Sequence, residues 1–145
     1  MKRHILLLAL PLAILGACQS GASGEEEKTE LETKVMAIHD EAMARMGDIY
    51  KLRRTLRSMR DTLEAQQQTD STTVLALEQE ISGLNKADEA MMQWMRQYSA
   101  PDTLQHEQAM DYLQQELVKV ERVQTIMDST IEAAQTTVKK YEQEK

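Results

Sequence analysis

Phenylalanine is absent from this chain, and aromatic residues of all kinds make up only 3% of its 145 residues. Proline and glycine are also scarce, with two and five copies. Strands favour aromatic and β-branched residues, and hairpin turns rely on glycine, so this composition argues against a sheet protein. A chain with few helix breakers and 28% charged residues is typical of long helices and coiled coils.

Cysteine and positive charge are the other shortages. Cys18 is the only cysteine, so a disulfide within the chain is excluded. Lysine and arginine number 17 against 24 acidic residues, which gives a formal net charge of −7. A protein with this excess of negative charge is poorly suited to neutralising phosphate groups. We therefore expect no nucleic-acid partner and no electrostatic adhesion to anionic lipid.

Residues 1–17 have the pattern of an export signal peptide. Two cations, Lys2 and Arg3, precede an apolar run over residues 5–15 that is too short to stay in a bilayer as a spanning helix. The run ends in Leu-Gly-Ala followed by Cys18, which matches the bacterial lipobox. We predict that the signal is cleaved before Cys18 and that this residue receives diacylglyceryl and fatty acyl chains such as palmitate.

The predicted lipid anchor determines where in the cell we expect the protein. Each methylene of a buried acyl chain contributes ~0.8 kcal/mol, so two or three chains on Cys18 hold a protein on a membrane. Gln19 is not the aspartate that retains lipoproteins in the inner membrane, so we expect the outer membrane of a bacterial envelope, facing the periplasm. Residues 18–24 are predicted to be a flexible tether. The processed chain keeps 15 basic and 24 acidic residues, a formal charge of −9.

Residues 25–145 show the heptad periodicity of packed helices. Apolar residues recur at alternating steps of four and three over residues 26–67, 71–98 and 102 to the C-terminus, and we predict one helix for each stretch. Every stretch carries one polar residue within its apolar stripe. These are Arg45, Asp88 and Gln124.

The connections between these stretches are short. Asp70 or Ser71 can cap the second helix, and Pro101 ends it because proline disfavours helix in the residue before it. Asp102 can then cap the third helix with Gln105 in a capping box. Short connections make neighbouring helices antiparallel. The predicted fold is all-α, an up-down-up three-helix bundle or antiparallel coiled coil, whose long first and third helices extend past the second.

The polar residues of the first two stripes are predicted to meet. A hairpin closed at the interruption places residue 45 opposite about residue 92, so Asp88 lies about one turn from Arg45. A polar pair that fixes the helix register is our prediction, and a functional carboxylate is the alternative. Gly47 falls opposite the turn that carries Trp94, and we expect it to make room for the indole.

The stretch ADEAMMQWMRQY, residues 87–98, concentrates three of the ten methionines and the only tryptophan. Thioether and imidazole groups together select soft Cu(I), so methionines and histidines near this stretch are candidate metal ligands. Methionine is also a pliable core filler in a chain that lacks phenylalanine, in which case no cofactor is bound. The candidate ligands are His39, Met43, Met46, Met91, Met92, Met95, His106 and Met110.

The residues that known catalytic motifs require do not occur at the required spacing. Met110 stands where a zinc-protease helix beginning at His106 would need its second histidine. No glutamate precedes His39 or His106 by three residues, which removes the di-iron bundle motif. A glycine-rich phosphate loop and a nucleophile elbow are missing as well. We predict no catalytic residue and no enzymatic activity.

Two segments carry a resemblance to a known family. HDEAMARM, residues 39–46, and ADEAMMQWMRQY, behind a lipobox, resemble a family of small uncharacterised lipoproteins from Bacteroidota, sometimes labelled viral A-type inclusion protein. The resemblance implies a lipoprotein with a helical domain and assigns no activity. Two functions stay open: a membrane-tethered module that docks an envelope protein or a second copy, and a periplasmic Cu(I)-binding protein.

Overall fold

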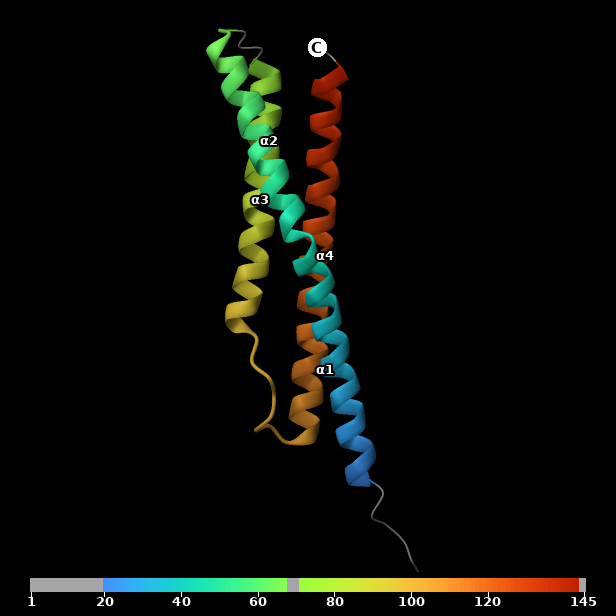
Figure 1. The fold of residues 1–145 in the computed structure, drawn as a ribbon. Helices are drawn as coiled ribbons and strands as arrows, with labels where there is room; N and C mark the ends of the chain where they lie inside the picture. The colour runs from blue at the N-terminus through green and yellow to red at the C-terminus, as the bar shows by residue number, and fades with distance from the viewer. Residues whose placement is uncertain (1–19, 68–70, 144–145) are drawn as a thin grey trace, which may run out of the picture.

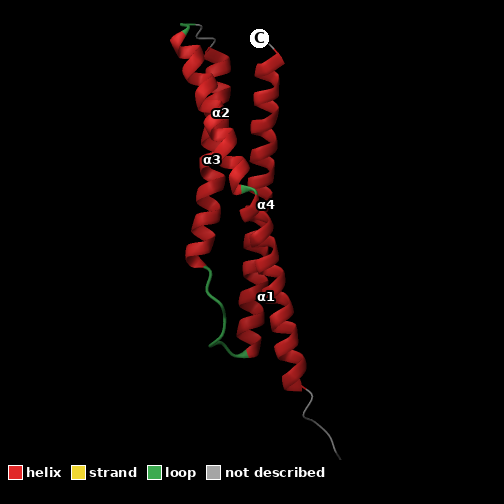
Figure 2. Ribbon diagram, in the orientation of Figure 1, coloured by secondary structure: helices red, strands yellow, loops and turns green. Residues whose placement is uncertain are grey.

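The computed structural model describes residues 20–67 and 71–143, and these residues are almost entirely helical (Figures 1 and 2). No strand occurs within these two ranges. The all-α prediction is therefore confirmed. The helices are α1 (Ser20–Ala44), α2 (Met46–Ala65), α3 (Ser71–Gln97) and α4 (His106–Gln143).

Helix α4, with 38 residues, is the element against which the others assemble. α3 packs along it, α2 packs mainly on α3, and α1 packs mainly on α4. Figure 1 shows α1 and α2 following each other along the molecule, with α1 beside the first half of α4 and α2 beside α3. The first predicted helix is thus two helices that lie on different neighbours.

Polar contacts define the directions of these helices. Gln124 donates a hydrogen bond to Glu41 at 3.1 Å, and Arg45 bonds Asp128 at 3.0 Å. Both pairs are 83 residues apart, so α1 and α4 advance in the same direction. α3 and α4 run in opposite directions. Their contacts include Glu80 with Thr137 and, nearer the C-terminus of α3, Gly83 with Thr130.

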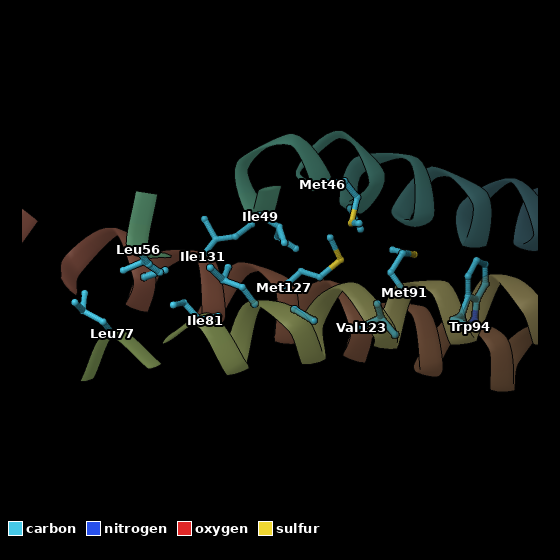
Figure 3. Packing of buried hydrophobic residues seen from close by; sticks show 14 of the residues in the cluster. Met46, Ile49, Leu56, Leu77, Ile81, Met91, Trp94, Val123, Met127 and Ile131 are labelled. Carbon is cyan, nitrogen blue, oxygen red and sulfur yellow. The ribbon is translucent and has the colours of Figure 1, made fainter. Parts of the chain in front are cut away.

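The core is one continuous strip of aliphatic and methionine side chains (Figure 3). The predicted stripes supply most of it. Met95 is an exception, because it is 41% exposed while Trp94 is buried in its place. A helix turn has 3.6 residues, so a strict heptad stripe drifts around it. The largest fully buried side chains are Val35, Ile49, Leu56, Leu77, Leu84, Met91, Leu113, Val120, Met127 and Ile131.

A break at Arg45 corrects the prediction of one helix over residues 26–67. The Arg45 amide bonds the Ala42 carbonyl at 3.0 Å and the Asp48 amide bonds the Arg45 carbonyl at 3.0 Å, both with the three-residue spacing of a tight turn. Gly47 lies two residues on and weakens helix locally. An added Cβ at Gly47 would meet no atom within 4 Å, so the prediction that this glycine makes room for Trp94 is wrong.

Two helix starts also differ from the predictions. α1 begins at Ser20, so residues 20–24 of the predicted tether are helical, and Gly24 lies against the ring of His106 on α4. α4 begins at His106 because a turn precedes it, in which the Leu104 amide bonds the Pro101 carbonyl at 3.2 Å. The predicted capping box of Asp102 and Gln105 is therefore wrong.

Several predictions fall on residues outside the described ranges. These are the signal peptide, the lipidated Cys18 and the capping role of Asp70. Among the described helices, none combines the length and apolar character needed to cross a membrane.

Two valines on α4 test the position of the core strip. Val120 is fully buried and Val118 is 65% exposed. We expect Val120→Thr to lower the free energy of unfolding by about 1–3 kcal/mol, because it buries a hydroxyl. Val118→Thr is the matched control and should change it by less than about 0.5 kcal/mol. Denaturant melts followed by circular dichroism measure both, and equal losses would contradict the assigned face.

Candidate functional site

The stretch that the sequence singled out forms the second half of α3 and ends beside α1 and α4. Trp94 is buried, with its ring 5.4 Å from the His39 ring of α1 and 5.0 Å from Tyr98. Tyr98 in turn lies 6.3 Å from Tyr112 of α4. These four rings form a ladder that connects α1, α3 and α4. We call it the aromatic ladder.

Tyr98 is the polar junction of the ladder. Its hydroxyl donates a hydrogen bond to Glu32 Oε1 of α1 at 3.4 Å. Burial raises the pKa of Tyr98 to about 12, and the nearby carboxylate of Glu32 adds to the increase. The next residue, Ser99, donates its amide to the hydroxyl of Tyr112 at 2.9 Å. The end of α3 is therefore bonded to both α1 and α4.

Glu116 of α4 is a buried carboxylate close to the ladder. Its side chain is 4% exposed and accepts a bond from Lys119 Nζ at 2.7 Å through Oε1. That bond raises the pKa of Lys119 above its ordinary value. Glu116 Oε2 has no hydrogen-bond partner among the described residues, and neither does the buried Trp94 Nε1. Buried polar atoms without partners are uncommon, and each costs the free energy of removing it from water. Both atoms therefore lower the stability of the folded state.

The predicted pair of Arg45 and Asp88 is wrong. Arg45 bonds Asp48 at 3.2 Å and Asp128 at 3.0 Å, while Asp88 bonds Arg53 at 3.1 Å. Arg53 and Asp88 are only 17% and 21% exposed, so they have the character expected of a register-setting pair. The register of α2 on α3 is close to the predicted one, because Arg53 also bonds Asn85 at 2.9 Å. Arg45 lies at the break between α1 and α2 and bonds Asp128 of α4 instead of Asp88.

The candidate copper ligands are spread over several parts of the molecule. Met46 and Met91 are buried in the core, where Figure 3 shows them together with Met127. Met43 and Met92 are partly buried against the same cluster. Met95 points away from it, being 41% exposed.

The two candidate histidines, His39 and His106, lie far apart. His106 packs against Gly24 at the start of α1, whereas His39 packs against Trp94 and bonds Asp40 at 2.9 Å through Nδ1. With the 83-residue offset of α1 and α4, His39 is level with residue 122, about 24 Å along α4 from His106 at ~1.5 Å per residue.

Met110 is also remote from the core methionines, in an open hollow of ≈ 540 Å³ that it lines with Leu31. The eight candidates therefore do not form one coordination sphere. Within the described residues, no group of three or more His, Cys, Asp or Glu side chains is arranged to hold a metal.

Three residues in or beside the methionine cluster and the aromatic ladder were not predicted. Met127 was not among the candidate ligands, and its place beside Met46 and Met91 depends on how α4 packs against α2 and α3. Tyr112 is off the predicted stripe. Glu116 was not singled out, although it lies three residues after the buried Leu113 and four before the buried Val120. This spacing places Glu116 on the buried side of the helix.

A double-mutant cycle tests the register of α2 on α3. We expect Arg53→Leu and Asp88→Leu to be coupled by roughly 0.5–3 kcal/mol, because each single change leaves a partly buried charge without its partner. The control cycle of Arg45→Leu with Asp88→Leu should be additive within about 0.5 kcal/mol. Free energies of unfolding supply both cycles. Coupling in the control cycle and additivity in the first would restore the predicted pair of Arg45 and Asp88.

The raised pKa of Tyr98 predicts a loss of stability at alkaline pH. Between about pH 10 and about 12 the unfolded chain has released the Tyr98 proton and the folded chain retains it, so the free energy of unfolding falls as pH rises. Tyr98→Phe should flatten this slope. Tyr50→Phe, at an exposed residue of α2, is the control for loss of one phenol. Denaturant melts across the window give the slopes, and an unchanged slope in Tyr98→Phe would contradict the assignment.

Comparison with known proteins gave no matching protein family, no matching curated protein and no matching solved structure.

Proposed function

We propose that this chain is a membrane-tethered helical lipoprotein of the bacterial envelope, and that its helical domain is a structural or interaction module without catalytic activity. One observation carries the proposal. Arg54 and Arg57 are exposed on α2 and make no ion pair or hydrogen bond within the described residues, although acidic residues outnumber basic ones 24 to 17 in the chain. Cations left unpaired on an acidic protein are suited to a partner's surface.

The surface around these arginines is consistent with docking. An open hollow of ≈ 790 Å³ lies over α2, lined by Tyr50, Arg53, Arg54 and Arg57 among others. Tyr50 is 43% exposed and Arg53 lies 5.1 Å from its ring centre. Tyrosine and arginine are the residues most enriched at the energetic centres of protein interfaces.

The proposal includes a finer description of the scaffold. We take it to be an up-down-up three-helix bundle with antiparallel coiled-coil seams, in which α1 and α2 together form the first rod. The heptad spacing of the buried residues supports this description. So do the contacts between α3 and α4, in which residue numbers rise along α3 as they fall along α4.

The anchor and the address are also proposed. The lipobox at Cys18 supports lipidation, and Gln19 supports the outer membrane, facing the periplasm. The resemblance to the Bacteroidota lipoprotein family supports the same address. A tether at one end leaves the exposed faces of α1 and α2 accessible to envelope proteins or to a second copy.

The alternative function is Cu(I) binding by methionine and histidine. The cluster of Met46, Met91 and Met127 favours it, because thioethers are soft ligands (Figure 3). The separation of His39 from His106 weighs against it. Competition between the purified protein and a Cu(I) chelator distinguishes the two functions, and we expect no uptake.

Substitution of the acylation residue tests the tether. Cys18→Ser should leave the chain unprocessed and unlabelled by radioactive palmitate, because the thiol is the proposed acyl acceptor. Ser20→Ala is the matched control and should be processed and labelled as the wild type is. Metabolic labelling of cells followed by fractionation of the envelope measures both properties. Normal labelling of Cys18→Ser would contradict the lipoprotein assignment.

A further inference from the structure

Helix α2 is basic although the protein as a whole is acidic. Its 20 residues include five basic and three acidic side chains, whereas acidic residues outnumber basic ones in each of α1, α3 and α4. Figure 1 shows α2 at the end of the molecule remote from the start of α1. Positive charge is therefore concentrated at one end of the described chain.

The open hollow along residues 50–66 contains cations that have no counter-charge. We call this hollow of ≈ 790 Å³ the basic hollow. Arg54 and Arg57 line it, are exposed, and make no ion pair or hydrogen bond with any other described residue. They are three residues apart, so both extend from the same side of α2. Two guanidinium groups therefore face solvent side by side.

The other charged residues that line the basic hollow already have partners. Arg53 bonds Asp88 at 3.1 Å. The Asp61 carboxylate accepts two hydrogen bonds from Arg60, at 2.7 and 3.1 Å. Because Asp61 has its own cation, it does not neutralise the two unpaired arginines. The hollow keeps an excess of positive charge.

Tyr50 gives the basic hollow an apolar surface beside the arginines. It is 43% exposed, and the guanidinium of Arg53 lies 5.1 Å from the centre of its ring. Arg53 is itself held by Asn85 and Asp88 of α3, so this cation–π contact restrains the ring. A restrained aromatic ring beside unpaired arginines has the composition of an interface centre.

We propose that the basic hollow binds a short acidic segment of a different protein, whose carboxylates pair with Arg54 and Arg57. The proposal rests on the interaction role proposed above and names the chemistry of the partner. The planar guanidinium fork matches a carboxylate and forms two parallel hydrogen bonds to it. Residues 50–66 span about 24 Å at ~1.5 Å per residue, which an extended segment of about seven residues covers at ~3.3 Å per residue.

The charges around the basic hollow favour a short segment over an anionic membrane or polymer. α1 follows the same line as α2 and has seven acidic residues against two basic ones (Figure 1). A broad anionic surface that reached Arg54 would therefore meet like charge along α1. Arg54 is also about 51 Å from Ser20 along the two helices at ~1.5 Å per residue. The hollow is thus at the opposite end of the molecule from the helix start that follows the proposed anchor.

Binding of a model peptide tests the proposed recognition. The probe is a heptapeptide of alternating glutamate and serine with an uncharged fluorescent dye, and its anisotropy measures binding to the full chain in non-ionic detergent. Arg54→Glu with Arg57→Glu should weaken binding by about tenfold, because two attractions become repulsions. Lys34→Glu with Arg122→Glu is the matched control at exposed residues of α1 and α4, and should leave binding unchanged.

The controls separate carboxylate recognition from attraction to net charge. A peptide with glutamine in place of glutamate should not bind, because it presents no carboxylate. Arg54→Gln with Arg57→Gln, which adds no repulsion, should weaken binding in the same direction by a smaller factor. Equal binding of the two peptides overturns the proposal, as does an equal loss in the control variant or no binding by the wild type.

Photo-crosslinking in the cell identifies the class of the natural partner. A photoreactive amino acid in place of Ser58, which is exposed and lines the basic hollow, should cross-link to a protein through a segment rich in aspartate and glutamate. Arg54→Glu with Arg57→Glu should abolish this cross-link. The same amino acid in place of Val118, which is exposed on α4, is the matched control and should not capture that protein.

The outcomes also separate the acidic partner from the interaction role. Mapping of the cross-link to a neutral or basic segment overturns the acidic partner and leaves the interaction role standing. Capture of a lipid, or of a second copy of this chain, overturns the proposed partner as well. If Ser58 captures nothing in a chain whose Cys18 is still labelled by palmitate, the partner is rejected and the tether stands.

Discussion

The apolar strip of α4 is the constraint on which the rest of this molecule depends. The strip runs from Ala109 to Tyr141, and a single helix that long cannot be covered by one neighbour of ordinary length. α3 covers one side of it, while α1 covers its first half. Hydrophobic burial along this strip at about 25 cal/mol per Å² provides the main driving force for assembly. The break at Arg45 lies where the first rod passes from packing mainly on α4 to packing mainly on α3.

Polar groups at the end of α3 hold α1, α3 and α4 in their relative positions. Tyr98 reaches Glu32 of α1, and Ser99 reaches Tyr112 of α4, so one short segment ties together helices from both halves of the sequence. Such contacts contribute little net stability, because each replaces a bond to water. Their value is geometric. Apolar stripes with heptad spacing can slide by whole turns, whereas specific polar partners meet in a single register.

Periodicity was enough to predict the helices, because their apolar stripes are long and regular. It did not predict the break, since Arg45 occupies a stripe position and a continuous heptad pattern runs through it. The nearby Gly47 was the available signal, but it was assigned a packing role. The predicted pair of Arg45 and Asp88 failed because Arg45 lies at the break and bonds Asp128 of α4, which spacing along the first two helices does not show. Trp94 and Tyr98 were found through their rarity, whereas Glu116 was missed because its burial depends on the neighbouring segments.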